Sequence, residues 1–382
     1  MQNFLEKNMK KVSESCKKKQ NEPIRVLQVG MHDKIGGVET FLMNYYRKMD
    51  RNKVQFDFIN MFEHLCFEDE IKKMGGMIYK VPNVKKKPFK YYKELRKIIR
   101  LNNYKIIHIN MLSMANILPI IAAHKEGVKH IILHSHNSGT PKGILRKILD
   151  KMNKKIAIKY ANHYFACSTL AGKWLYGNET HFEVINNAID VNKFKFDENK
   201  RKNMRRHLNL EDKFVIGHVG RFCEQKNHKF LIEILRKYLI LNPKTILLTI
   251  GEGELKNEIK SKALSYNLQD NIIFMDPIDN VNDYLQAMDV FVLPSLFEGL
   301  PVVAVEAEAN GLTVITSNTV SKELPIKELS VYCDLNYIDE WCKKIQNNIV
   351  RRMDRTDDIT NANYNIEVEA KKLTNMYIKM LL

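Results

Sequence analysis

The feature that most constrains the fold of this chain is a regular alternation of short apolar runs with helix-like patterns. It begins at residue 24, breaks at the charged stretch 195–210 and starts again at 214. Strands that alternate with helices form parallel sheets covered on both faces. The strand-like runs are 24–30, 55–61, 105–110, 129–137, 163–168 and 182–190, and then 214–221, 244–251, 271–276, 290–295 and 312–317. The sequence therefore predicts an α/β fold with two doubly wound halves.

A length of 382 residues is comfortable for two domains, and the charged stretch marks where they would join. We expect a hinge near 190–212. The predicted organisation is a basic N-terminal extension over 1–23, a first domain over 24–192, a second domain over 193–360, and a C-terminal helix over 361–382 that packs back towards the first domain.

The composition is that of a globular protein, with 45% hydrophobic and 27% charged residues. The first twenty residues contain no apolar segment of a secretory signal, and no run of eighteen apolar residues occurs in the sequence. The six cysteines form no CxxC pair, so we read them as reduced thiols. These features predict a cytoplasmic protein without a membrane span.

A formal net charge of +17 predicts an anionic partner. Basic residues mix with apolar and aromatic ones over 80–100 and 141–160, and the second segment places its apolar residues at helical spacing. This pattern is typical of an amphipathic helix on an anionic membrane surface. A solvated, lysine-rich helix is the alternative. The sequence shows no basic recognition module, so we expect no nucleic acid as partner.

The string "VGRFCEQKN" (219–227) ends a predicted strand with two cations, Arg221 and Lys226. A guanidinium and an ammonium group at one strand end suit a diphosphate, whose oxygens they can bind from different sides. Taken alone, the string is also explained by surface ion pairs.

The string "GMHDKIGGVETF" (30–41) places Gly36 and Gly37 between the first predicted strand and its helix. Backbone approaches phosphate groups at this position in many α/β proteins. The string is neither a P-loop nor the GxGxxG dinucleotide fingerprint, and a plain turn is the alternative.

The string "HSHN" (134–137) closes another strand with His134 and His136. Alternate residues of a strand face opposite sides, so we expect one histidine at most to face a ligand directly. Zinc could bind a His-x-His pair, but no third ligand follows at a suitable spacing.

The segment "LPSLFEGLPVVAVEAEANG" (293–311) carries glutamates on both sides of an apolar run. We expect a helix from about Pro301, with Glu298 just before it and Glu306 two turns into it. The amides of Gly299 and Leu300 would then face a ligand at the positive helix end. Carboxylates pair with hydroxyl groups, so two of them suit a sugar and a ribose. A helix N-terminal acid would explain Glu298 but not Glu306.

In this order and at these strand ends, the motifs resemble a retaining GT-B glycosyltransferase of family 4. The strings "GGVETFLMNYYR" and "HSHN" are similar to its bacterial exopolysaccharide and capsule branch, the EpsF-like enzymes. The resemblance covers about residues 24–380. It implies two Rossmann-like domains that face a central cleft, an acceptor-side N-terminal one and a nucleotide-sugar-binding C-terminal one.

The resemblance implies a role for each matching position of the second half. Glu306 would hold the donor ribose, and Glu298 would contact the transferred sugar together with the amides of Gly299 and Leu300. Arg221 and Lys226 would bind the donor diphosphate and stabilise its charge as it leaves.

Three further roles follow from the same resemblance. The backbone of Gly36 and Gly37 would close over the diphosphate. The catalytic histidine of the family aligns best with His136, with His134 as the alternative. Met275 would meet the base through its backbone, although Asp276 stands where the family often has glycine.

The implied activity is the transfer of a sugar from a nucleotide-diphosphate sugar, with UDP as the expected nucleotide, to a lipid-linked glycan at the inner face of the cytoplasmic membrane. No Asp-x-Asp follows a suitable strand, so we expect an enzyme that requires neither a cofactor nor a metal ion. The alternatives are a non-catalytic nucleotide-sugar-binding protein and a transferase with a soluble acceptor.

Overall fold

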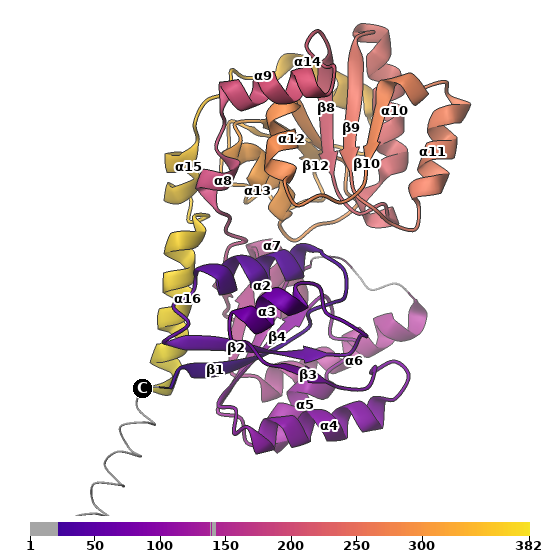
Figure 1. The fold of residues 1–382 in the computed structure, drawn as a ribbon. Helices are drawn as coiled ribbons and strands as arrows, with labels where there is room; N and C mark the ends of the chain where they lie inside the picture. The colour runs from indigo at the N-terminus through magenta and orange to yellow at the C-terminus, as the bar shows by residue number, and fades with distance from the viewer. Residues whose placement is uncertain (1–21, 138, 140–142) are drawn as a thin grey trace, which may run out of the picture. The chain divides into compact units, whose positions relative to one another are not determined.

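The computed structural model describes residues 22–137, 139 and 143–382, which form two compact units. The first unit runs up to His134 and includes 148–164 and 370–382, and the second comprises 135–147 and 165–369. Each unit contains a parallel sheet with flanking helices (Figure 1), so the predicted fold of two Rossmann-like α/β domains is confirmed. Of the predicted N-terminal extension, residues 1–21 lie outside the described residues.

The first described sheet has the strand order β3-β2-β1-β4-β5-β6-β7. Its strand β1 lies parallel between β2 and β4, with Val26 opposite Phe56 on one side and Ile106 on the other. The strands are β1 (Ile24–Val29), β2 (Val54–Asn60), β3 (Ile78–Lys80), β4 (Ile106–Met111), β5 (His130–Ser135), β6 (His163–Ala166) and β7 (Glu183–Val184). The helices that follow these strands are α2 (Gly37–Lys48), α3 (Glu68–Lys73), α4 (Pro88–Leu101), α5 (Leu118–Lys125), α6 (Ile144–Tyr160) and α7 (Thr169–Tyr176).

The second described sheet has the order β10-β9-β8-β11-β12-β13, and all its neighbouring strands are parallel. Its strands are β8 (Phe214–Val219), β9 (Thr245–Ile250), β10 (Ile272–Met275), β11 (Val290–Leu293), β12 (Thr313–Ser317) and β13 (Ser330–Cys333). The helices of this unit include α8 (Val191–Phe194), α9 (Glu198–His207), α10 (His228–Leu241), α11 (Lys256–Ser265), α12 (Val281–Ala287), α13 (Val302–Ala309), α14 (Ile338–Asn347) and α15 (Thr356–Asn361). Two apolar clusters cover its two faces and bury the strands that carry the strand-end loops.

Helix α16 (Ile366–Leu381) brings residues 370–382 into the first unit (Figure 1). Its Tyr377 is fully buried against Phe56 of β2, with ring centroids 5.9 Å apart. The Tyr377 hydroxyl lies 2.6 Å from Nδ1 of His108 on β4. The core of the first unit is therefore completed by a helix that follows the second unit in sequence.

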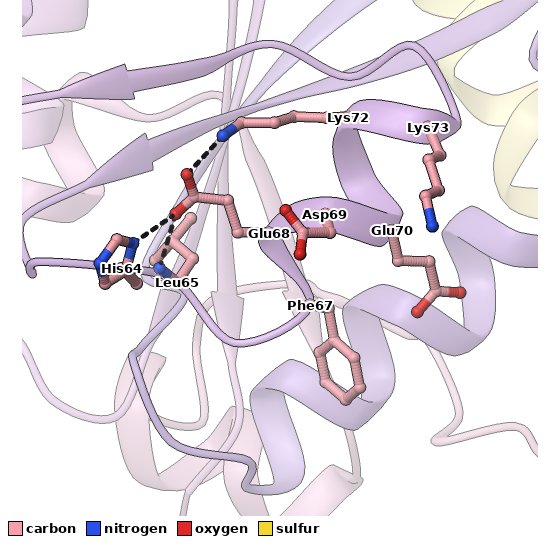
Figure 2. A pocket seen from close by; sticks show the side chains of 8 residues that line it. All are labelled: His64, Leu65, Phe67, Glu68, Asp69, Glu70, Lys72 and Lys73. Carbon is pink, nitrogen blue, oxygen red and sulfur yellow. Dashed lines mark hydrogen bonds and ion pairs between the residues drawn. The ribbon is translucent and has the colours of Figure 1, made fainter.

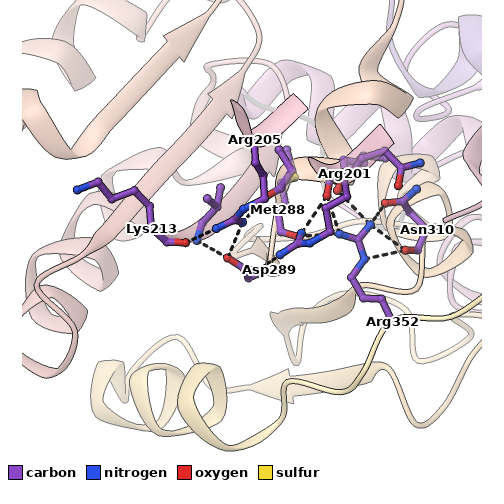
Figure 3. A network of polar contacts seen from close by, with 11 residues as sticks. Arg201, Arg205, Lys213, Met288, Asp289, Asn310 and Arg352 are labelled. Carbon is purple, nitrogen blue, oxygen red and sulfur yellow. Dashed lines mark hydrogen bonds and ion pairs between the residues drawn. The ribbon is translucent and has the colours of Figure 1, made fainter. Parts of the chain in front are cut away.

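Three arginines hold helix α9 and the segment around residue 352 against the rest of the second unit (Figure 3). Arg201 and Arg205 both pair with Asp289, which also accepts the amide of Val215 at 2.7 Å. Arg352 donates to the carbonyls of Gln286 and Met288 at the end of α12. The last carbonyls of a helix have no donors within the helix, and the guanidinium groups of Arg201 and Arg352 donate to them instead.

The run 182–190, which we predicted as a strand, forms a strand only over Glu183–Val184, and its Ile189 makes an isolated parallel bridge with Asn365. Both residues are exposed, because β7 lies at the edge of its sheet. Among the described residues, no helix combines the length and the apolar character needed to cross a bilayer.

Candidate active site

Two loops at the carboxyl ends of β8 and β11 meet in the second unit. The side-chain amide of Gln225 donates to the carbonyl of Phe297 at 2.9 Å, and the backbone carbonyl of Gln225 accepts the amide of Leu296 at 2.8 Å. Residue 225 therefore fixes the loop that bears Arg221 and Lys226 against the loop that bears Glu298.

The structure brings Lys226 and Glu298 into one ion pair. Their Nζ and Oε1 atoms are 2.7 Å apart, and the two side chains are only 16% and 12% exposed. A buried charge requires a partner, so each group compensates the other while no ligand is bound. A ligand that carries both anionic and hydroxyl groups could separate this pair. Lys226 would then bind the anionic group and Glu298 a hydroxyl group.

Arg221 differs from Lys226 in both exposure and partner. Its guanidinium pairs with Glu254 at 3.2 Å, and both side chains are 58% exposed. An exposed pair of this kind is held weakly and is free to reorient. The two predicted diphosphate ligands therefore start from different states, one buried and one in solvent.

The loop after Glu298 is shaped by side chains from elsewhere in the second unit. The carbonyls of Gly299 and Leu300 accept hydrogen bonds from Ser168 at 2.9 Å and from Asn187 at 2.7 Å. A Cβ atom on Gly299 would lie 2.9 Å from the Sγ atom of the buried Cys167, so a larger residue does not fit. The amide of Leu300 also donates to this thiol. This amide, which we predicted to bind the sugar donor, therefore has an acceptor within the protein.

Two acids of helix α13 are buried. Glu306 is 9% exposed, and burial raises its pKa to about 7, with Lys193 acting in the opposite direction. Glu308 is fully buried and accepts the amide of Ile326 at 2.9 Å, and burial raises its pKa to about 8. Pro301 is the N-cap of α13, with extended backbone at ψ 119°, and not its first helical residue as we predicted.

The carbonyl of Met275 already accepts two protein hydrogen bonds. The donors are the amide of Gly251 at 3.1 Å and the Nζ atom of Lys256 at 3.2 Å. Lys256 also pairs with Asp276 at 2.6 Å, so the residue that replaces the family glycine is tied to this lysine. Gly251 has a φ of 154°, and a Cβ atom there would lie 2.1 Å from the carbonyl of Gly220, so glycine allows the ends of β8 and β9 to approach.

The two candidate histidines lie in different surroundings. His134 is fully buried, with Nδ1 3.1 Å from Nε2 of His108, and its ring packs edge-on against Phe41. His136 is half-buried, and desolvation lowers its pKa to about 3, so its imidazole is neutral near pH 7. Its carbonyl lies 3.2 Å from the position of a Cβ on Gly299.

In the first unit, Gly36 is the N-cap of α2 and Gly37 its first residue. Both are exposed, in a loop that runs from β1 to α2. A Cβ atom on Gly37 would have no neighbour within 4 Å.

A hollow of about 700 Å³ lies elsewhere in the first unit, beside α3 (Figure 2). Two of its acids are already paired, Glu68 with Lys72 at 2.6 Å and Glu70 with Arg47 at 2.7 Å. None of the predicted site residues lines it. The described part of the chain also contains no cluster of three or more side chains arranged to hold a metal ion.

Sequence reasoning missed several residues that shape these loops. Gln225 stands inside the string that carries Arg221 and Lys226, and Lys256 follows the glycines 251 and 253, so adjacency could have indicated both. Ser168 and Asn187 act on Gly299 and Leu300 across more than a hundred residues, and no local pattern indicates such contacts.

Two family models match this chain. Residues 35–193 match glycosyltransferase family 4, and residues 199–327 match the glycosyl transferases group 1. EpsF of Bacillus subtilis (strain 168) is 32% identical over 312 residues, which cover 78% of this chain and 80% of EpsF. The UDP-Gal:alpha-D-GlcNAc-diphosphoundecaprenol alpha-1,3-galactosyltransferase of Escherichia coli is 28% identical over 75% of this chain and 78% of its own.

Solved structures agree with this relationship at the level of the fold. The structure of Anabaena HepE in complex with UDP and glucose matches 93% of this chain and 100% of its own, with a TM-score of 0.72 and 15% identity. Matching family models, a relative above 30% identity and this shared architecture lead to one conclusion. The chain belongs to the family 4 glycosyltransferases of GT-B fold.

Proposed function

We propose that this glycosyltransferase moves a sugar from a UDP-sugar to a lipid-linked glycan in exopolysaccharide or capsule biosynthesis, with retention of the anomeric configuration. The largely buried pair of Lys226 and Glu298 carries the proposal, because it offers a cation for a phosphate and a carboxylate for a sugar side by side. The name of the Escherichia coli relative gives UDP-Gal and a diphosphoundecaprenol-linked sugar, and HepE was solved with UDP and glucose.

In the proposed reaction, the bond between the anomeric carbon and the diphosphate oxygen breaks, and a bond to the acceptor oxygen forms on the same face. The proton of the acceptor hydroxyl passes to the departing phosphate. Lys226 and Arg221 stabilise the charge that grows on the diphosphate. Glu298 binds hydroxyls of the sugar, and Glu306 binds the ribose. The two cations, Arg221 and Lys226, take the place of a divalent metal ion at the diphosphate.

The test is a screen of UDP- and GDP-sugars for slow hydrolysis by the full-length protein, followed by transfer to a polyprenyl-diphosphate-linked sugar. We expect turnover with a UDP-sugar, an unchanged anomeric configuration by NMR, and full activity in excess EDTA. Failure to bind or cleave any donor would refute the donor proposal. An inverted product would refute retention, and a loss in EDTA that Mn²⁺ restores would refute metal independence.

We also propose that helix α6 binds an anionic membrane surface. Its polarity is the reverse of an ordinary surface helix, whose apolar side faces the core. Asp150 is buried and accepts the amide of Met114 at 2.6 Å, and Asn153 donates to the carbonyl of the same residue at 2.9 Å. The outward side carries exposed apolar residues with cations between them, namely Ile144, Leu145, Ile148, Leu149, Met152 and Ile156 beside Arg146, Lys147, Lys151 and Lys155.

The start of α4 adds a second feature of the same kind. Phe89 is 84% exposed and lies within the exposed cations Lys85, Lys86, Lys87 and Lys90. Apolar residues that enter the lipid interface among lysines that attract anionic headgroups are typical of peripheral membrane proteins. This surface supports an acceptor in the membrane.

Replacing Lys147, Lys151 and Lys155 by glutamine should release the protein from anionic vesicles and leave donor hydrolysis unchanged. Each cation near such a surface contributes about 1 kcal/mol, so partition should weaken by about a hundredfold. Glutamine at the exposed Lys202, Lys244 and Lys260 removes the same charge elsewhere and should change partition much less. Equal losses in both triple variants would refute a specific role of α6.

A further inference from the structure

Glu39 is a buried acid beneath an exposed loop of the first unit. Residues 32–37 between β1 and α2 are exposed, whereas Glu39, in the first turn of α2, is 5% exposed. None of the family-derived roles involves this residue. Burial raises its pKa, so the chain keeps an acid where its ionised form is disfavoured.

The carboxylate of Glu39 is held by backbone groups of this loop. Its Oε1 atom accepts the amide of His32 at 2.9 Å, and its Oε2 atom lies 2.9 Å from the position of a Cβ on Gly36. The amides of Gly36 and of Glu39 itself also favour its ionised form. An acid in the first turn of a helix that reaches back to the N-cap amide follows the logic of a capping box, here extended to residue 32.

The other side of the loop is fixed as well. The carbonyl of His32 accepts the thiol of Cys66 at 3.1 Å and the amide of Cys66 at 3.3 Å. Both backbone groups of residue 32 are therefore anchored, one by Glu39 and the other by Cys66. The loop has a defined shape although its side chains face solvent.

The two glycines of the loop have different explanations. A Cβ atom on Gly36 would meet the Glu39 carboxylate, so internal packing requires a glycine there. Gly37 has no such neighbour, and its backbone does not lie in the left-handed region. Close approach of a ligand is a common reason for a glycine that packing does not require.

We propose that Glu39 is a positioning residue, which holds the loop 30–37 in the shape that presents the backbone of Gly37 to the donor diphosphate. Glu39 does not touch the donor in this arrangement. The proposal rests on the proposed function, because the diphosphate is the ligand to which the loop is presented. It predicts that Glu39 acts on donor affinity much more than on the rate at saturation.

The experiment compares Glu39→Ala, Glu39→Gln and a control, with full-length protein and UDP as the calorimetric probe. Alanine removes the acceptor of the His32 amide, and UDP Kd and donor KM should rise by about ten- to a hundredfold, with kcat within about threefold. Glutamine keeps one acceptor oxygen and should recover most of the affinity. The control is Gln55→Ala, which removes another buried acceptor of the same unit, bonded to Tyr46 at 2.7 Å. It should lower the Tm and leave Kd and KM unchanged.

A second variant protects the test against misfolding of Glu39→Ala. Gly36→Ala pushes a methyl group against the carboxylate and should raise UDP Kd in the same way. If both variants bind UDP like the unaltered protein, Glu39 has no positioning role and the proposed function still stands. If the unaltered protein binds neither UDP nor GDP, both proposals are wrong.

Discussion

The loops that follow the first strands of the two sheets occupy the same place in the fold but are anchored by side chains of opposite charge. The loop 30–37 after β1 is held by a buried acid, Glu39, which accepts the amide of His32, and residues 32–37 of the loop are exposed. The loop 220–227 after β8 carries a largely buried cation, Lys226, which Glu298 neutralises. We infer that the second unit supplies most of the electrostatic stabilisation of a diphosphate.

The largest effect should come from Lys226→Ala, because it removes the buried cation and leaves Glu298 uncompensated beside an anionic donor. We expect kcat/KM to fall by about 30- to 1,000-fold, equivalent to about 2–4 kcal/mol of transition-state stabilisation. Steady-state kinetics with the donor found in the screen give the value. The control Lys229→Ala removes an exposed lysine that is paired with Glu258 and should have little effect. A loss below about threefold for Lys226→Ala would contradict the inferred division between the two loops.

A smaller effect is expected for Arg221→Ala. This side chain is 58% exposed, so its charge is screened and its loss should lower kcat/KM by about 3- to 30-fold. Glu254→Gln removes its partner and should leave the rate nearly unchanged, because exposed pairs contribute little. If Arg221→Ala is as damaging as Lys226→Ala, the donor must draw Arg221 into a buried position.

The smallest effect concerns pH and separates two buried acids, Glu306 of the second unit and Glu39 of the first. The pKa of Glu306 is raised to about 7, so its carboxylate is lost as pH falls through 7. Donor hydroxyls bind the carboxylate form, and UDP affinity should therefore fall between pH 8 and pH 6 by at most about tenfold. Glu306→Gln should flatten this dependence. Glu39→Gln should preserve it, because Glu39 does not touch the donor, and a flat profile there would contradict its assigned position.

The central strands of both described sheets were predictable, whereas two of their four edge strands were not. Strands such as β4 and β9 are buried along their whole length and read as mainly apolar runs. The strands β3 (IYK) and β13 (SVYC) lie at sheet edges, are short and largely half-exposed, and gave no such run. These short edge strands form because they pair with a neighbouring strand that lies elsewhere in the sequence, and their own residues do not indicate that pairing.

The candidate site likewise has a part that local sequence indicated and a part that it did not. The charged residues at strand ends were recognisable, since Arg221, Lys226, Glu298 and Glu306 stand in short strings with a chemical meaning. The pairing of Lys226 with Glu298 was not, because 72 positions separate them and the contact depends on how two loops pack. Likewise, the sequence left His134 and His136 as alternatives. The structure places His134 in a buried contact with His108, which in turn meets Tyr377 of a distant helix.

That helix has a consequence for the synthesis of the protein. Tyr377 fills the core of the first unit, yet it is translated only after all of residues 165–369. During translation, the strands β1, β2 and β4 must therefore wait, with Phe56 and His108 uncovered, while the second unit is made. Domains commonly fold in the order in which they leave the ribosome. Here the unit that emerges first is the one whose core is completed last.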